Sequence, residues 1–318
     1  NLTFLLLVLV TLTLNSCKES NKKSEGITQK TTEKKVSFFK LSLAEWSLHQ
    51  SINNGTLNPF DFAQKAKELG FEGIEYVNHL YNKQIDSLGL DAVLDTLKIK
   101  SQKYGVQNLL IMVDGEGDLA SADDKVRNKA VNNHKKWVDA AAFLGCHSIR
   151  VNLFGSEVPD EWVVNSEKGL HDLATYGKSK NINIIVENHG GLSSNAELLT
   201  KVIENVGVDN VGMLPDFGNF CLKREGGKRW DAPCIEEYDR YKGVGIMMKH
   251  AKGVSGKSYD FDESGNETTI DYPKMLQIVK DSGYNGFIDV EYEGTRLPEE
   301  EGIKATRDLL LKSAKQLN

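Results

Sequence analysis

Four side chains that can bind a metal ion end or follow short apolar stretches in the second half of the chain. They are Glu187 after Ile182–Val186, Asp216 after Val211–Leu214, His250 within Ile246–Lys252 and Glu291 within Phe287–Tyr292. Each one alone has an ordinary explanation as a helix cap, an ion-pair partner or a packed side chain. Together, three carboxylates and one imidazole form a hard, oxygen-rich set, which favours Mn²⁺, with Mg²⁺, Co²⁺ and Zn²⁺ as alternatives. Unpaired carboxylates beside an apolar wall would be costly, and a divalent cation would neutralise them.

Strand-like and helix-like segments alternate from Val36 to the C-terminus, and they must position these four groups. The expected strands are 36–47, 71–77, 106–113, 148–154, 183–187, 211–214, 246–252 and 287–292, with helices over 58–69, 90–104, 122–144, 166–180, 196–206, 235–242, 272–281 and 298–317. Strict alternation indicates a parallel sheet, and eight units in this length predict an α/β fold of the closed (β/α)8 TIM barrel type. A doubly wound open sheet is the alternative, but no GxGxxG follows the first strand. In a barrel, the four groups would meet at the carboxyl ends of the strands.

Other polar residues near the expected strand ends are candidates for substrate binding. They are His49, Glu75, His79, Arg150, Asn152, His189 and Lys252. Arg150 would be costly inside a barrel without an anionic partner, so we expect one there. Lys252 lies two residues from His250, and the period of two in a strand places both on the same face. The polar stretch 255–269 is expected to be either a lid over the substrate or a solvated hairpin.

The composition is that of a globular protein with one large core. Of the 318 residues, 40% are hydrophobic and 26% are charged, and the formal net charge is −6. Nucleic acid and anionic membrane surfaces attract basic faces, so neither is expected as the main partner. Beyond the N-terminal region three cysteines remain, and an odd number does not form a complete disulfide framework. Cys146 is expected in the core, whereas Cys221 and Cys234 share one loop and are either paired or free.

The N-terminal residues have the pattern of a processing signal. An apolar run, Leu2–Leu14, is followed by Asn15, Ser16 and Cys17, and this order is similar to a bacterial lipoprotein signal. The similarity implies a signal peptide over 1–17, cleavage before Cys17, lipidation of that cysteine, and export to the periplasm or cell surface. The membrane would then be contacted only through the lipid anchor. Residues 18–35 are too polar to form a core and are expected to be a flexible tether, which leaves 36–318 as the catalytic domain.

Five segments resemble one family of barrels. They are GFEGIEYV (70–77), VENHGG (186–191), LPDFGNF (214–220), KHAKG (249–253) and GYNGFIDVEYEG (283–294). With these motifs the chain from about Phe38 onward resembles the xylose isomerase-like barrels of the sugar phosphate isomerase/epimerase superfamily. The resemblance implies that the family's metal quartet falls on Glu187, Asp216, His250 and Glu291. The ketose epimerases carry a histidine three residues after the aspartate ligand, where it contacts the sugar; Asn219 stands there in this chain and is the candidate contact.

Such a site supports proton transfer next to a carbonyl group. Glu187 and Glu291 would remove a proton on one face of the substrate and return it on the other, which gives a metal-dependent isomerase or epimerase. If the carbanion expels a leaving group, the site is instead a lyase or hydratase acting on 3-keto-glycosides or inososes. A non-catalytic carbohydrate-binding lipoprotein is a third hypothesis. Export and the lack of a glycine-rich phosphate loop predict an unphosphorylated carbohydrate as substrate. The sequence does not determine the oligomeric state, and a homo-oligomer is compatible with it.

Overall fold

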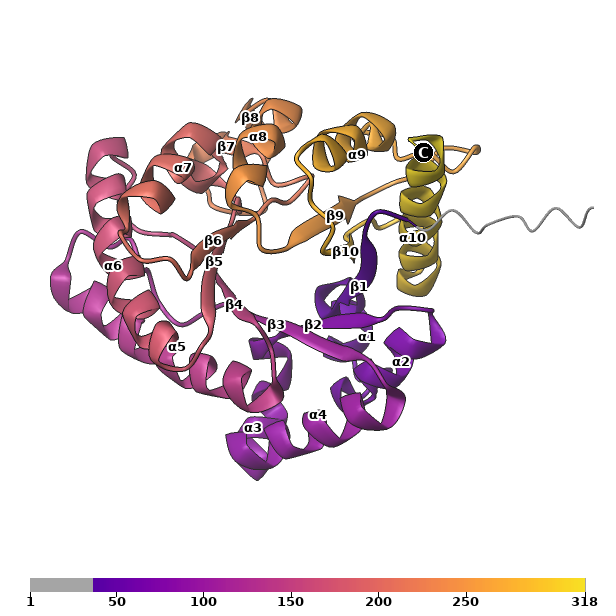
Figure 1. Ribbon diagram of the computed structural model, residues 1–318, viewed down its shortest axis with the longest axis horizontal. Helices are drawn as coiled ribbons and strands as arrows, with labels where there is room; N and C mark the ends of the chain where they lie inside the picture. The colour runs from indigo at the N-terminus through magenta and orange to yellow at the C-terminus, as the bar shows by residue number, and fades with distance from the viewer. Residues whose placement is uncertain (1–36, 318) are drawn as a thin grey trace, which may run out of the picture. The chain divides into compact units, whose positions relative to one another are not determined.

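An eight-stranded parallel sheet forms the centre of the fold in a computed structural model that describes residues 37–317 (Figure 1). Its strands are β1 (Lys40–Ala44), β2 (Gly73–Val77), β3 (Gln107–Val113), β4 (Ser148–Val151), β5 (Asn183–Glu187), β6 (Val211–Leu214), β9 (Val254–Ser258) and β10 (Phe287–Tyr292). The strands are short and almost entirely buried, which is the pattern of parallel strands covered by helices. Neighbours in the order β6-β5-β4-β3-β2-β1-β10-β9 are paired, so that Leu43, for example, lies opposite Ile74 on one side and Val290 on the other.

The two ends of this sheet, β6 and β9, meet and close a ring. Isolated parallel bridges pair Met213 of β6 with Ala251, just before β9, and Asp216, just after β6, with Ser255 of β9. The backbone N–H groups of Lys252 and Ser255 donate to the carbonyl oxygens of Met213 and Pro215, each over 2.9 Å. All eight strands therefore belong to one barrel, and the predicted TIM barrel is confirmed.

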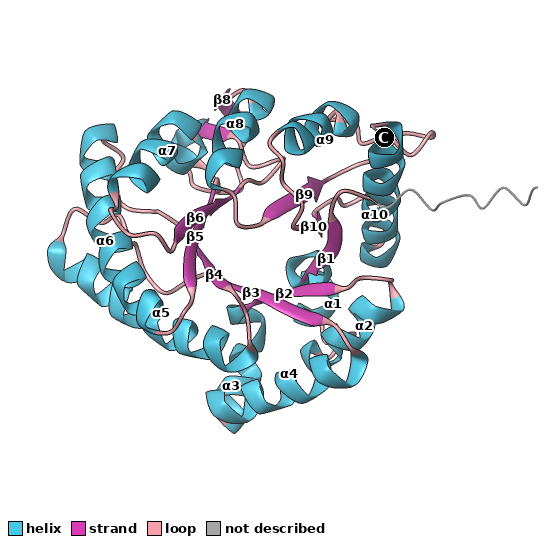
Figure 2. Cartoon of the chain, in the orientation of Figure 1, coloured by secondary structure: helices cyan, strands magenta, loops and turns pink. Residues whose placement is uncertain are grey.

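Helices surround the strands on the outside (Figure 2). They are α1 (His49–Asn53), α2 (Phe62–Glu68), α3 (Asn82–Leu88), α4 (Leu90–Tyr104), α5 (Asp124–Leu144), α6 (Pro159–Ser179), α7 (Ala196–Asn205), α8 (Arg240–Met247), α9 (Tyr272–Asp281) and α10 (Glu299–Gln316). The helix α4 stops at Gly105, whose φ of 64° is in the left-handed region that glycine adopts without strain. The helix α5 starts after Asp123, whose carboxylate accepts two backbone N–H groups of its first turn. These start and stop residues, both visible in the sequence, set the points at which the chain returns to the barrel.

The two faces of the strands differ in chemistry. One set of alternating residues is apolar and fully buried, as at Ile149, Ile184 and Val290. The other set is largely polar: Ser42 in β1 donates its hydroxyl hydrogen to Glu75 in β2 over 2.8 Å, and both are buried. The interior of the barrel is therefore polar well below the strand ends.

The structure departs from the predicted elements between residues 221 and 258. Two strands, β7 (Cys221–Arg224) and β8 (Cys234–Glu237), form an antiparallel hairpin where a helix over 235–242 was expected. The helix α8 follows later, and with the 3-10 turn Met248–His250 it occupies the segment expected as strand 246–252. A short apolar run such as Ile246–Met248 suits a buried helix end as well as a strand, and the sequence pattern does not separate the two.

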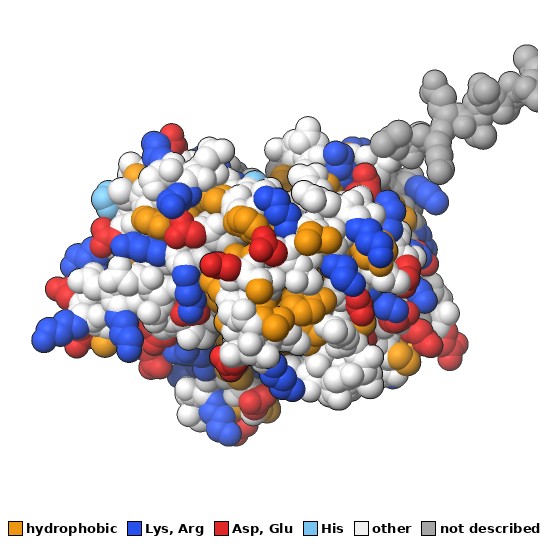
Figure 3. Space-filling model, turned by 90° about the horizontal axis from the view of Figure 1, so that it is seen from below, with side chains coloured by type: hydrophobic (Ala, Val, Ile, Leu, Met, Phe, Trp, Pro, Cys, Tyr) orange, Lys and Arg blue, Asp and Glu red, His pale blue; other side chains and the backbone are white. Residues whose placement is uncertain are grey.

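The predicted signal peptide, Cys17 and the tether lie outside the described residues. Among residues 37–317, no helix has the length and apolar character needed to span a membrane. On the face drawn in Figure 3, positive and negative side chains are interspersed with hydrophobic ones. This face lacks the single-signed field that would attract a polyanion.

Glu45 links the end of β1 to the end of β2 beneath the barrel mouth. Its side chain is fully buried, and it accepts the backbone N–H of Val77 over 2.9 Å and the hydroxyl hydrogen of Tyr81 over 2.5 Å. Burial raises the pKa of Glu45 to about 8, although both hydrogen bonds act in the opposite direction. The folded chain therefore holds a proton at Glu45 that the unfolded chain, with the ordinary value of 4.5, releases.

This proton makes folding stability depend on pH. Between about pH 4.5 and 8 the unfolded state binds fewer protons at Glu45, so the free energy of unfolding should fall as pH rises, by up to about 1.4 kcal/mol per pH unit. Glu45→Gln removes this titration, and its stability should decline less steeply than that of the wild type over this window. Urea unfolding at pH 5.5, 6.5 and 7.5 measures both slopes. Parallel slopes would show that Glu45 is ionised in the folded chain.

Candidate functional site

A cavity of about 1020 Å³ opens at the carboxyl ends of the strands. Every strand of the barrel contributes to its wall at or just after its end, through Trp46, Val77, Val113, Asn152, His189, Asn219, Tyr259 and Glu293. This is the end at which barrels of this type carry their active sites. The cavity is therefore the candidate site, and the predicted residues can be compared with it.

Three of the four predicted metal ligands lie together. Glu187, Asp216 and Glu291 are buried and place one carboxylate oxygen each within 4.8 Å of the others, so this cluster could hold a metal ion. Asp216 Oδ1 accepts the backbone N–H groups of Gly218 and Asn219, each over 2.7 Å. By contrast, Asp216 Oδ2 and Glu187 Oε2 are buried without a hydrogen bond to any described residue. Both oxygens instead lie near cations of the chain, Glu187 Oε2 2.9 Å from Arg150 Nε and Asp216 Oδ2 3.7 Å from Lys257 Nζ.

The fourth predicted ligand, His250, is not in the cluster, and this prediction is corrected. His250 ends the 3-10 turn before β9, and its Nε2 lies 3.1 Å from Glu204 Oε1 on α7. The cause is the misplaced strand: β9 begins at Val254, four residues after His250, so the imidazole lies before the strand and away from its carboxyl end.

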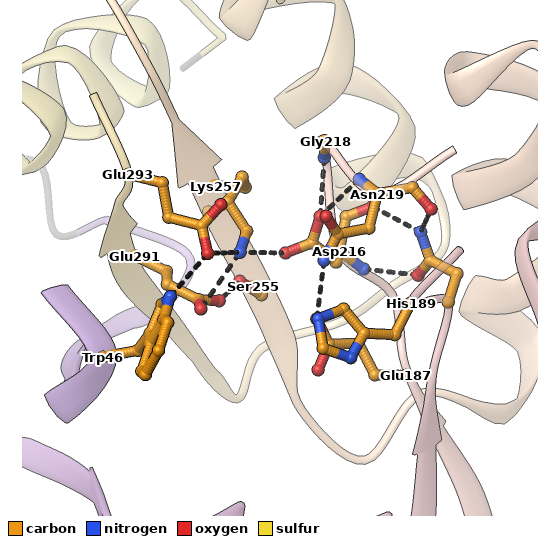
Figure 4. A network of polar contacts seen from close by, with 12 residues as sticks. Trp46, Glu187, His189, Asp216, Gly218, Asn219, Ser255, Lys257, Glu291 and Glu293 are labelled. Carbon is orange, nitrogen blue, oxygen red and sulfur yellow. Dashed lines mark hydrogen bonds and ion pairs between the residues drawn. The ribbon is translucent and has the colours of Figure 1, made fainter. Parts of the chain in front are cut away.

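A lysine that the sequence analysis did not select lies among the carboxylates (Figure 4). Lys257 Nζ is 3.0 Å from Glu291 Oε1, 3.0 Å from Glu293 Oε1 and 3.7 Å from Asp216 Oδ2. Lys257 is fully buried, and its aliphatic stem packs on Gly218, where an added Cβ would lie 2.7 Å from Lys257 Cγ. The backbone after β6 is therefore built closely around this side chain.

Strand β9 reaches the cluster with two side chains, Ser255 and Lys257, which share a face because they are two residues apart. Ser255 Oγ donates to Glu291 Oε2 over 3.0 Å. Both were missed because residues 255–269 were expected to form a lid or hairpin outside the barrel. Glu293 was missed too, although it follows Glu291 by two residues, and that spacing was a usable signal.

Burial dominates the electrostatics of these carboxyl groups. It raises the pKa of Glu291 to about 8 and that of Asp216 to about 6, although the Lys257 ammonium acts against both shifts. Burial also acts to raise the pKa of Glu293, but Lys257 more than offsets it, so this pKa lies below its ordinary value. The single ammonium thus keeps Glu293 ionised and leaves Glu291 close to the range in which a carboxyl group can both accept and release protons.

Arg150 holds the remaining carboxylate of the cluster. Its Nε lies 2.9 Å from Glu187 Oε2, and its Nη1 donates to Asp114 Oδ1 over 2.8 Å. Burial would raise the pKa of Asp114, but the guanidinium more than offsets it and keeps this carboxylate ionised. Asn219 Nδ2 donates to Glu187 Oε1 over 2.9 Å. The anionic partners expected for Arg150 are therefore present, and their contacts keep Glu187 beneath the cavity wall, whereas Glu291 is part of that wall.

Most of the predicted substrate contacts line the cavity. They are His49, His79, Arg150, Asn152, His189 and Asn219. His189 Nδ1 lies 2.8 Å from Asn152 Oδ1, which orients its ring. The imidazole of His49 stacks on Trp46 with ring centroids 4.2 Å apart. These residues form a polar wall beside the acidic cluster, and their role in substrate binding stays a prediction.

Two predicted contacts lie elsewhere and are corrected. Glu75 is the middle residue of β2 and accepts the hydroxyl hydrogen of Ser42 inside the barrel. Lys252 lies at the amino end of the barrel, where it lines a separate cavity of about 530 Å³ together with His147 and Tyr284. Both corrections follow from strand bounds, because β2 extends to Val77 and β9 starts only after Lys252.

A disulfide-linked hairpin forms one side of the cavity. Cys221 in β7 and Cys234 in β8 are bonded, which decides the pairing that the sequence left open. The segment between them brings Arg229 and Trp230 to the cavity wall. The indole ring of Trp230 lies 4.8 Å from the imidazole of His189. The hairpin thus adds aromatic surface next to polar groups from the strand ends.

Removing the disulfide should loosen this side of the cavity while the barrel stays folded. Cys221→Ser/Cys234→Ser opens a short loop and should lower the free energy of unfolding by no more than about 3 kcal/mol. We expect trypsin to cleave after Lys228 or Arg229 about tenfold faster, because the segment opens locally. Mass spectrometry of the fragments measures the rate. Reducing agent should reproduce the effect in the wild type and add nothing in the double variant; equal cleavage of all samples would contradict the prediction.

The barrel and its mouth define an α/β barrel protein with a ligand site at the carboxyl ends of the strands. The chain belongs to the xylose isomerase-like TIM barrel family, whose model matches residues 63–313. No curated protein matches the chain.

Several solved structures share the fold. The D-psicose 3-epimerase of Clostridium cellulolyticum H10, with D-tagatose, is 13% identical over 87% of this chain and 99% of that chain, with a TM-score of 0.67. The IolI protein with a zinc atom is 16% identical over 87% and 99%, with a TM-score of 0.65. The 3-keto-D-glucoside 4-epimerase YcjR of E. coli is 13% identical over 86% and 99%, with a TM-score of 0.64. At such low identity, the likeness establishes the fold alone.

The family resemblance implies a metal ion, and the residues at β9 test that implication. The spacing of Glu187, Asp216 and Glu291 suits an ion, but β9 supplies a hydroxyl and an ammonium where an imidazole was expected. Lys257 Nζ contacts two of the three carboxylates, so an ion bound by all three would lie beside a positive charge in a buried site, where like charges repel strongly. The side chains that β9 contributes therefore do not fit a divalent cation.

Proposed function

We propose that this chain is a sugar isomerase or epimerase, which moves a proton next to a carbonyl group of an unphosphorylated carbohydrate. One observation carries the proposal: Glu291, held by Ser255 and Lys257, lies in the wall of a cavity at the strand ends that is large enough for a sugar. Two structural neighbours, a D-psicose 3-epimerase and a 3-keto-D-glucoside 4-epimerase, are named for the same class of reaction, which supports the proposal.

The cavity wall combines the two kinds of surface that a carbohydrate needs. Trp46, Phe154 and Trp230 present aromatic rings, which pack on the C–H faces of sugar rings. Hydroxyl groups can be bound by the polar residues His49, Arg150, Asn152, His189 and Asn219. The wall also contains six acidic residues, which outnumber its three arginines and would repel a phosphate group: Asp114, Glu116, Asp118, Asp231, Glu291 and Glu293. This lining supports an unphosphorylated substrate.

The mechanism that we propose uses the carboxylates of the chain itself. Glu291 removes the proton from the carbon next to the carbonyl; the C–H electron pair forms the new C=C bond and the carbonyl π pair moves to the oxygen, which gives an enediolate. Glu187, protonated and released from Arg150 by the substrate, then donates its proton to the other face. Glu291 is left protonated and Glu187 ionised, and proton exchange with solvent restores both before the next turnover. A proton returned to the same carbon gives an epimer, and one returned to the neighbouring carbon gives an isomer. The sequence led us to expect a divalent cofactor, with Mn²⁺ favoured, but the position of Lys257 argues against it.

Substitutions of the two glutamates separate their roles in deuterated water. Glu291→Gln should lower both deuterium uptake by the sugar and product formation by about 10²–10⁴-fold, because the first proton transfer is lost. Glu187→Gln should lower product formation by a similar factor, but deuterium uptake at the carbon that Glu291 deprotonates should continue at the wild-type rate. NMR of the sugar and chromatography of the products measure the two rates over a panel of ketoses, inososes and 3-keto-glycosides.

The matched control is His250→Ala, because this residue pairs with Glu204 outside the cluster and should leave both rates unchanged. Release of a free leaving group from a 3-keto-glycoside would instead identify a lyase. Tight binding of sugars without turnover by the wild type would identify a carbohydrate-binding lipoprotein. Either result would overturn the isomerase proposal.

We further propose that the enzyme acts outside the cytoplasm and is anchored through Cys17. The order Leu14, Asn15, Ser16 and Cys17 supports this localisation. In a bacterial host, Cys17→Ser should abolish incorporation of labelled palmitate and move the protein from the membrane fraction to the soluble fraction. Equal labelling of both forms would contradict the proposed anchor.

A further inference from the structure

We propose that the ammonium group of Lys257 replaces the metal ion at this site, so that the protein functions without a bound divalent cation. The observation behind it is the identity of the side chains that β9 sends into the acidic cluster. Ser255 stands at the bridge to Asp216 and donates to Glu291, and Lys257 follows one step further along the same face. Strand β9 thus contributes a positively charged side chain to the cluster, where a metal-binding side chain was expected.

The charges at the mouth already have cationic partners. Lys257 contacts Asp216, Glu291 and Glu293, and Arg150 contacts Glu187. Four carboxylates from three strand ends are therefore each within 4.0 Å of a cation that belongs to the chain. A buried acidic cluster needs such partners, and here fixed side chains supply them.

The lysine is also held in place, so it is not a side chain that could swing aside for an ion. It is fully buried, and Gly218 leaves room for its stem. Its partner Glu293 is fixed from the other side by Trp46, whose Nε1–H donates to Glu293 Oε1 over 2.7 Å. Figure 4 shows the ammonium between Glu293, Glu291 and Asp216. Moving it would break three ion pairs and leave a cavity in a packed region.

The two carboxylate oxygens of the cluster without hydrogen bonds do not need an ion either. Glu187 Oε2 lies 2.9 Å from Arg150 Nε, and Asp216 Oδ2 lies 3.7 Å from Lys257 Nζ. Each of these oxygens is therefore already beside a cation of the chain.

Metal content tests the proposal without any substrate, so its failure is distinct from a failure of the proposed function. The wild-type protein is dialysed against Mn²⁺ or Zn²⁺, unbound ions are removed, and the metal content per chain is measured by elemental analysis. Thermal unfolding is measured in parallel, because a bound ion raises the unfolding temperature. We expect less than about 0.1 ion per chain and no thermal shift. The Lys257→Met variant should bind Mn²⁺ or Zn²⁺ at least about tenfold more tightly than wild type does, because the ammonium that repels the ion is gone. The Ser255→His/Lys257→Met variant should bind the ion more tightly still, because it adds an imidazole ligand.

The controls keep each outcome decisive. Lys257→Arg retains the cation and should resemble wild type, and Lys252→Met removes a lysine at the other end of the barrel and should change nothing. One bound ion per wild-type chain that is lost in Asp216→Asn would overturn the proposal. So would a folded Lys257→Met variant that gains no affinity, since the ammonium would then not be what excludes the ion. If Lys257→Met does not fold, the metal content of the wild type, with Asp216→Asn as its comparison, decides.

Discussion

The contact of Lys257 with Asp216, Glu291 and Glu293 is the interaction on which the mouth of the barrel depends. Carboxylates removed from water are stable as anions only beside a cation or several hydrogen-bond donors. Lys257 serves three of them from one position, and it does so between β6 and β10, the two neighbours of β9. The same side chain therefore links the acidic groups after β6 to those of β10 across β9. The ring itself is closed by backbone hydrogen bonds of Lys252 and Ser255, and Lys257 adds the positive charge at its mouth.

A second cation performs the same task on the opposite side. Arg150 in β4 bridges Glu187, at the end of β5, to Asp114, which follows β3. Each of the two cations thus connects carboxylates from different strands. A ligand that enters the cavity meets a set of acceptors whose positions are already fixed. This is preorganisation, because binding need not order the charged groups first.

The sequence predicted the strands and helices that have regular apolar patterns, and it failed where a short apolar run is compatible with either a strand or a helix. The apolar strands at 183–187, 211–214 and 287–292 have the predicted bounds, and so do the helices at 90–104 and 272–281. The strand β9, with the sequence VSGKS, is buried but contains one apolar side chain, whereas the run Ile246–Met248 before it is apolar and helical. The more apolar segment, 246–252, was predicted to be the strand, and His250 and Lys252 were therefore wrongly placed at the carboxyl end of the barrel. Tertiary contacts decide this case, because the serine and lysine of β9 are buried by partners distant in sequence.

Below the mouth, charge is handled in another way. Glu75 and Asp289 are fully buried within the barrel, with no cation among the ion pairs that the described residues form around them. Burial raises the pKa of Glu75 to about 7 and raises that of Asp289 well above its usual range. These carboxyl groups therefore favour the protonated form with no cation beside them, whereas each of the four at the mouth lies within 4.0 Å of Lys257 or Arg150. Burial also raises the pKa of Glu291 to about 8, so contact with Lys257 does not by itself keep a carboxyl group ionised. Glu293 differs, because its pKa lies below the ordinary value beside the same ammonium. Charge at the mouth is thus set by protons and fixed cations together, whereas protons alone balance Glu75 and Asp289 deeper in the barrel.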